Sequence, residues 1–145
     1  MKTKISSSSI FLALSGFIIT VLGLYFIFLR PALLPEDLRF MGTSLDQIQR
    51  LAPGLLIWLQ RVFWVMGGYM FATGLLTIYI ALATFRTQSK SAQLVVMSAS
   101  LSSIGWMAII NFTIDSDFKW LILLFNIPWI VALALSWRTR SKNEH

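Results

Sequence analysis

The chain has 145 residues, of which 57% are hydrophobic and only 12% are charged. A water-soluble domain carries roughly 25% charged residues, so this composition predicts a single domain that folds in hydrocarbon. The net charge is +6, but the basic residues cluster at the ends of apolar runs, which is typical of membrane orientation and argues against a nucleic-acid partner.

Four apolar stretches are long enough to cross a bilayer, since about 30 Å of hydrocarbon takes roughly 20 helical residues. They cover residues 10–29, 62–85, 94–112 and 118–137, and none alternates as a barrel strand would. The first follows a basic N-terminus, as a signal peptide would. Its apolar run is longer than the roughly 7–15 residues of a signal peptide, so we expect a retained span.

The connection over residues 30–61 is the only one with room for structure of its own. Pro31 and Pro35 favour an extended stretch at its start. The motif Ser44-Leu45-Asp46-Gln47 is typical of a capping box and predicts a short helix through about Leu51. We expect this helix to lie at the membrane surface, because its apolar residues share one face: Leu45, Ile48, Leu51 and Leu55.

Orientation follows from the basic residues that flank the spans. With four spans, the side shared by both termini holds seven: Lys2, Lys4, Arg86, Lys90, Arg138, Arg140 and Lys142. The other side holds five, namely Arg30, Arg39, Arg50, Arg61 and Lys119, together with all but one of the six acids. The sequence therefore predicts both termini in the cytoplasm and the long connection outside it.

A group of charged residues opens the long connection and is the first candidate site. Arg30, Glu36, Asp37 and Arg39 stand close together near the expected interface. Two acids and two bases in such a place are candidates for binding a polar headgroup or a partner. The alternative is ordinary solvated loop charge, with Arg30 reaching from the end of the first span to the headgroups.

Two asparagines at membrane depth form the second candidate site. Asn126 stands two residues before Pro128, whose missing N–H leaves the carbonyl of Leu124 without its helical partner. Asn126 can satisfy freed backbone groups or a neighbouring helix, or it can line a ligand pocket. The same two readings hold for Asn111, near the outer end of the third span.

Small residues recur at helical spacing and predict close helix packing. They are Gly16 and Gly23 on the first span, Gly67 and Gly74 on the second, and Ser98, Ser102 and Gly105 on the third. Packing within one bundle is the default, and a dimer face or a pore is the alternative. No acid or base lies deep in a span, which argues against an ion-coupled transporter.

Metal and cofactor chemistry has few ligands to draw on in this chain. There is no cysteine, which excludes thiolate nucleophiles, Cys-ligated zinc and iron–sulfur clusters. The single histidine is His145, at the end of the sequence, where a buried ligand or base is not expected. We predict no metal site and no cofactor.

The layout resembles the small four-helix membrane families loosely called DoxX-like. The residues that carry the resemblance lie in about the first 85 positions: Gly23-Leu24, Arg30 to Pro35, Phe40-Met41-Gly42, Gly67-Gly68-Tyr69 and Gly74-Leu75-Leu76. The resemblance implies a compact antiparallel four-helix bundle and carries no functional residues across.

The fold class expected is all-α, a transmembrane antiparallel four-helix bundle with one longer extracytoplasmic loop that carries a short interfacial helix. The leading functional hypothesis is a non-enzymatic accessory or scaffold subunit bound to another membrane protein or to itself. A binder or passive carrier of a lipophilic molecule is the second. The third is a lipid-modifying enzyme at the outer interface, with acid–base groups among Glu36, Asp37, Asp115 and Asp117.

Overall fold

The computed structural model describes residues 6–83, 85 and 89–143, and every regular element within these ranges is helical. A π-helical turn over Leu101–Gly105, labelled η2, joins α5 to α6. The α-helices in chain order are α1 Ser7–Phe28, α2 Pro35–Met41, α3 Leu45–Leu51, α4 Leu55–Leu82, α5 Lys90–Ser100, α6 Trp106–Thr113, α7 Lys119–Leu124 and α8 Ile127–Asn143.

Four helical segments are long and apolar enough to cross a membrane, which makes this chain a multi-pass membrane protein. They are α1, α4, the third span Lys90–Thr113 and the fourth span Lys119–Thr139. Each overlaps one of the four predicted stretches. The second begins at Leu55, about two turns earlier than residue 62, and position 84 near its predicted end lies outside the described residues.

The α1–α4 pair is held by a glycine seam, made of Gly16 and Gly23 on α1 and Gly67 and Gly74 on α4. A Cβ added at Gly23 would lie 2.7 Å from the carbonyl oxygen of Gly67, and one added at Gly16 would lie 2.8 Å from that of Gly74. The early glycine of α1 thus faces the late glycine of α4, so the two helices run in opposite directions. Without side chains at these four positions, the two backbones approach closely.

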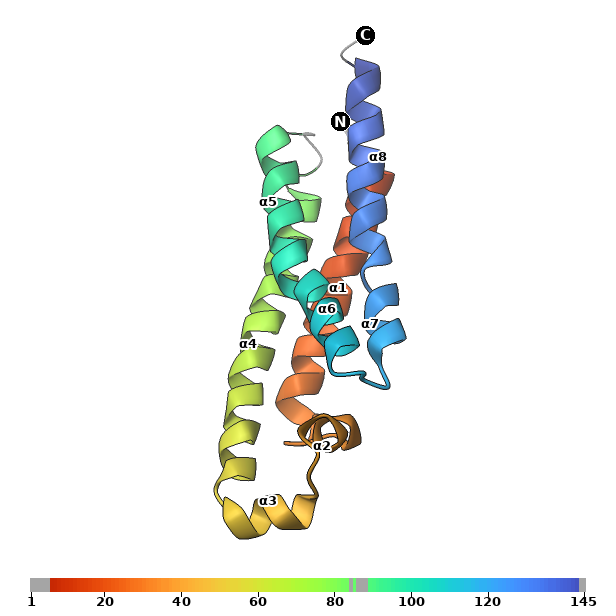
Figure 1. The fold of residues 1–145 in the computed structure, drawn as a ribbon. Helices are drawn as coiled ribbons and strands as arrows, with labels where there is room; N and C mark the ends of the chain where they lie inside the picture. The colour runs from red at the N-terminus through yellow and green to blue at the C-terminus, as the bar shows by residue number, and fades with distance from the viewer. Residues whose placement is uncertain (1–5, 84, 86–88, 144–145) are drawn as a thin grey trace.

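The core lies where α1 meets α4, the third span and α8. Figure 1 shows α1 between α4 on one side and α8 on the other, with the third span crossing in front. The buried apolar residues at this junction are Leu12, Ile19, Ala81, Phe85, Val96, Ile104, Trp129, Ala132 and Leu133. Its polar contact is buried too: the amide of Gln93 donates to the hydroxyl of Ser136 at 2.6 Å.

The long connection forms two short helices, α2 and α3, at one end of the molecule (Figure 1). We call this the loop end, and it also contains the connection between α6 and α7. The first residues of α1 and the last of α8 lie at the other end. The loop end positions the charged residues discussed below.

The sequence does not predict helix α2, and its expectation of an extended stretch at Pro35 is wrong. Pro35 instead occupies the first helical turn, where its missing N–H costs nothing and its fixed φ suits a helix. The carboxylate of Asp37 accepts the N–H of Leu34 at 2.8 Å and caps this turn. Gly42, with a φ of 65°, ends the helix in the left-handed conformation that favours glycine.

Helix α3 has the bounds that the capping box indicates. The Ser44 hydroxyl accepts the N–H of Gln47 at 3.3 Å, and the Gln47 side chain accepts the N–H of Ser44 at 3.2 Å. Of its apolar face only Ile48 is buried, whereas Leu51 is 86% exposed. Apolar surface of this helix therefore points away from the protein.

Candidate functional site

Arg30 lies directly after α1 and is enclosed by aromatic rings. Its guanidinium carbon stands 3.5 Å from the ring centroid of Phe63 on α4 and 5.3 Å from that of Phe26 on α1. Its side chain is only 9% exposed. The amide of Gln60 donates to the Arg30 carbonyl at 3.1 Å, which fixes the backbone as well. Side chains from both helices of the glycine seam, α1 and α4, therefore contact Arg30.

Asp37 is the counter-ion of Arg30 and the cap of α2 at once. The Arg30 Nη2 lies 3.3 Å from Asp37 Oδ2, the atom that also accepts the N–H of Leu34. Burial lowers the pKa of Arg30, and the negative charge of Asp37 opposes that change. Because a guanidinium stays protonated even so, the pair is a lasting ion pair that attaches α2 to the end of α1.

Glu36 and Arg39 attach α2 to the connection between α6 and α7. Glu36 is 2% exposed, and its Oε1 accepts the hydroxyl of buried Ser116 at 3.1 Å. Its Oε2 has no hydrogen-bond partner among the described residues. Arg39 is exposed and lies 2.7 Å from a carboxylate oxygen of Asp117. The loop end is therefore closed by one buried and one exposed polar contact.

The two acids of the connection between α6 and α7, Asp115 and Asp117, are also paired. The hydrogen bond and positive charge of Lys119 lower the pKa of exposed Asp115. The hydrogen bond and negative charge of Asp117 likewise raise the pKa of Arg39. The candidate residues Arg30, Glu36, Asp37 and Arg39 are thus brought together, but each acid has a different partner. In the described chain this arrangement joins helices and leaves no two carboxylates bonded to a shared group.

Asn126 sits in the break between α7 and α8. Its own N–H bonds to the Leu123 carbonyl at 3.0 Å, one position short of the α-helical partner, Ile122. The Asn126 side chain takes over that partner, because Nδ2 donates to the Ile122 carbonyl at 2.8 Å. It also donates to Ile104 across the helix interface at 3.4 Å, and its Oδ1 accepts Trp129 Nε1 at 3.0 Å.

The π-helical turn Leu101–Gly105 faces this break from the third span. A π turn shifts the backbone ladder from i→i−4 to i→i−5 and loosens the carbonyls around it. Two hydroxyls bond to the carbonyls one turn earlier: Ser102 to Ser98 at 2.8 Å and Ser103 to Ala99 at 2.6 Å. Two irregular backbone segments therefore lie opposite each other at membrane depth. Such segments are tolerated there only where other groups form hydrogen bonds with their free backbone N–H and C=O groups.

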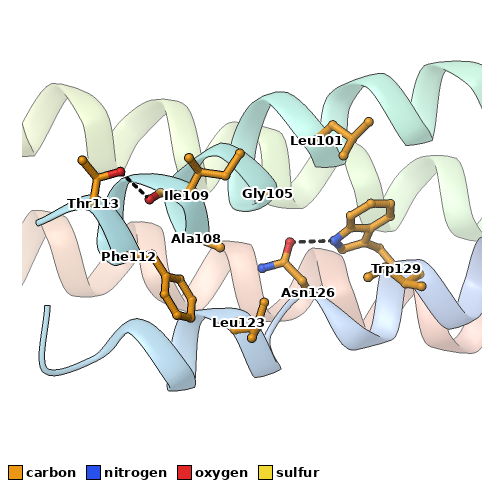
Figure 2. A pocket seen from close by; sticks show the side chains of 10 residues that line it. Leu101, Gly105, Ala108, Ile109, Phe112, Thr113, Leu123, Asn126 and Trp129 are labelled. Carbon is orange, nitrogen blue, oxygen red and sulfur yellow. Dashed lines mark hydrogen bonds between the residues drawn. The ribbon is translucent and has the colours of Figure 1, made fainter. Parts of the chain in front are cut away.

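A groove of about 650 Å³ runs between the third and fourth spans beside these two irregular segments. Figure 2 shows Gly105 and Ala108 on one wall, with Asn126 and Trp129 on the other. The span-groove residues are Leu101, Gly105, Ala108, Ile109, Phe112, Thr113, Leu123, Asn126, Trp129 and Ile130. Among them only Asn126 was a candidate in the sequence.

Asn111 does not join Asn126. Its Nδ2 donates to the Met107 carbonyl at 2.9 Å, one turn earlier in α6, and it does not line the groove. The Asn111 carbonyl accepts the N–H of Ser116 at 2.9 Å and so ends α6. The sequence analysis did not identify Trp129, although its spacing of three residues from Asn126 was an available signal. It did not identify the π turn either, because the four serines near it did not reveal one.

Metal ligands do not gather in the part of the chain that the structure describes: within it, no group of three His, Cys, Asp or Glu side chains is placed to hold an ion. The comparisons with known proteins add no family. No family model, curated protein or solved structure matches this chain, so the resemblance to DoxX-like families stays a prediction.

Proposed function

We propose that this protein is a non-enzymatic accessory subunit that binds another membrane-spanning helix, on a second protein or a second copy of itself, through one face of α4. The proposal takes the four spans to be an up-and-down bundle in the bilayer. It rests on one observation, the composition of the side of α4 that faces away from α1.

This α4 face consists of Val65, Gly68, Tyr69, Ala72 and Leu76, all of them exposed. Gly68 and Ala72 are four residues apart, the small-xxx-small spacing that lets a second helix approach closely. A Cβ added at Gly68 would meet nothing within 4 Å, in contrast to its neighbour Gly67 in the glycine seam. Of the four spans, α4 is also the least buried within the protein.

Tyr69 gives the α4 face a polar group that hydrocarbon cannot satisfy. It lies near the midpoint of α4, its side chain is 73% exposed, and no partner for its hydroxyl is found in the described chain. An unbonded hydroxyl in an apolar medium costs roughly 2–7 kcal/mol. A backbone or side-chain acceptor on a neighbouring helix removes that cost, and lipid tails do not.

Orientation in the membrane is part of the proposal. The side shared by both termini holds seven Lys and Arg residues against five on the other side, which predicts that both termini are cytoplasmic. Three of the counted residues, Lys2, Lys4 and Arg86, lie outside the described residues. In this orientation α2 and α3 lie on the opposite side, with the exposed apolar surface of α3 against the lipid headgroups.

A photo-crosslinking amino acid at position 69 tests the proposed docking face in native membranes. We expect a protein–protein adduct from this position and only lipid adducts from position 95, which is exposed on α5. The substitution Ala72→Leu should remove the adduct, because a leucine there holds the second helix away. The matched control is Ala134→Leu, at an exposed alanine on α8.

Two outcomes would overturn the proposal. One is a position-69 probe that reacts with lipid alone. The other is an adduct that survives Ala72→Leu as fully as Ala134→Leu. The mass of the adduct separates the two forms of the proposal, since a second copy doubles the mass of the chain and a different partner does not.

A further inference from the structure

We propose that the span groove holds one acyl chain of a bilayer phospholipid, taken from the leaflet at the loop end. The groove lies on the third and fourth spans, away from the α4 face, so this inference stands independently of the proposed function. Three observations carry it: the saturation of its polar groups, its length along the spans and the bond that joins its walls.

The polar groups in the groove wall are already bonded within the protein. Both N–H groups of Asn126 donate to carbonyls, and its Oδ1 accepts from Trp129. The Thr113 hydroxyl donates to the Ile109 carbonyl at 3.0 Å, as Figure 2 shows. The other residues that line the groove have apolar side chains or none. A ligand in the groove therefore meets hydrocarbon, which suits an alkyl chain and not a headgroup.

The groove is too short for a helix that crosses the membrane. Its lining runs from Leu101 to Thr113 on the third span, about 18 Å along a helix axis. A crossing helix would pack along the whole hydrocarbon core of about 30 Å.

The length and position of the groove match one leaflet. Leu101 is at the midpoint of the third span Lys90–Thr113, and Trp129 is at the midpoint of the fourth span Lys119–Thr139. Phe112 and Thr113 lie at the loop end. A groove of about 18 Å from mid-span to the loop end corresponds to half of a hydrocarbon core of about 30 Å. An acyl chain whose headgroup stays at the loop-end surface spans that distance.

The two groove walls are fixed to each other beside Gly105, the last residue of the π turn. The Asn126 bond to the Ile104 carbonyl joins the two walls at the floor. Asn126 is thus a positioning residue, which holds the wall without offering a bond to the lipid.

Native mass spectrometry of the whole protein, transferred from bilayers of a single phospholipid into a delipidating detergent, tests this inference. We expect one retained phospholipid per chain. Ile109→Trp, on the groove rim, should fill the groove and lower retention by about tenfold or more. Ile110→Trp is the matched control, because this neighbouring isoleucine is exposed but does not line the groove.

A phospholipid with a photoreactive group near the end of its acyl chain locates the site. We expect its adducts on peptides that contain residues 101–109 or 126–130, and their loss in Ile109→Trp. The inference fails if wild-type protein retains no phospholipid or if the two variants retain it equally. It also fails if the retained molecule from native membranes is an isoprenoid, or if adducts fall outside these peptides.

Discussion

At the scale of single residues, irregular backbone is matched by individual side chains. Asn126 replaces the backbone N–H that the Ile122 carbonyl loses at the helix break, and it reaches Ile104 on the neighbouring span as well. The sequence placed Asn126 beside freed backbone groups because of Pro128. It indicated the carbonyl of Leu124 and not that of Ile122, since the break lies at residues 125–126 and depends on the fold around it.

Replacing Asn126 by leucine should destabilise the protein by about 2 kcal/mol, because two carbonyls and the Trp129 indole lose their partner in apolar surroundings. Thermal unfolding in a fixed detergent measures the loss. Asn111→Leu is the control and should cost less than half as much, since it breaks one hydrogen bond within a single helix. Equal losses would contradict the bridging role of Asn126.

Arg30→Lys should cost about 1–2 kcal/mol of stability although the charge is kept. An ammonium cannot lie flat between the rings of Phe26 and Phe63 while it also bonds to Asp37. Detergent unfolding with Arg61→Lys as the reference measures this, because exposed Arg61 contacts one ring, that of Trp64. A loss no larger than that of the reference would show that the enclosure of Arg30 contributes nothing.

Asp115 should titrate below its usual value of about 3.9, because Lys119 stabilises the carboxylate. Since the folded pKa is lowered, the favourable contribution is present above the ordinary pKa and is lost as the pH falls through the lowered value. Carbon NMR of the side-chain carboxyl group gives the midpoint. Lys119→Gln should move that midpoint upward, and an unchanged midpoint would rule out the pair as its cause.

At the scale of elements, the sequence predicts the four spans, and of their two interruptions it indicates only the one beside Pro128. Apolar runs locate the four spans, the Ser44 motif locates α3, and the seven-residue spacing of glycines anticipates close packing. The π turn escaped prediction because serine hydroxyls also bond to the carbonyl four residues earlier in regular helices. Helix α2 escaped because Pro35 is compatible with both an extended strand and a first helical turn.

Gly67→Ala and Gly68→Ala should change stability in opposite directions. A Cβ at Gly67 would lie 2.7 Å from the Gly23 carbonyl oxygen, so α1 and α4 must separate. A Cβ at Gly68 meets nothing within 4 Å, and alanine improves an exposed helix by about 0.5–1 kcal/mol. Unfolding of the dilute protein in detergent compares the two. Two changes of the same sign would contradict the glycine seam.

At the scale of the whole molecule, the distribution of charge predicts the topology in the membrane. The candidate charged residues all lie at the loop end. The sequence grouped Arg30, Glu36, Asp37 and Arg39 because they are near neighbours in the chain. It could not pair Glu36 with Ser116 or Arg39 with Asp117, because about 80 residues separate these partners. Long-range pairing of this kind is a property of the fold.

Single cysteines test the orientation without competing thiols, since the chain has none of its own. Gln49→Cys on α3 and Ser141→Cys near the end of α8 are both exposed positions. In intact cells a membrane-impermeant maleimide should label position 49 and leave position 141 unlabelled until the cells are permeabilised. The reverse pattern would invert the topology, and equal labelling of both would contradict the odd number of crossings, three, that separates them.

The glycine seam also bears on the order in which the protein is made. Of the four spans, α1 and α4 leave the ribosome first, and translation at about 5–20 residues per second leaves seconds before the last span follows. The close backbone approaches of the seam lie entirely between these two helices. A finished helical hairpin can therefore wait in the bilayer as a template, against which the later, irregular half of the protein assembles as it emerges.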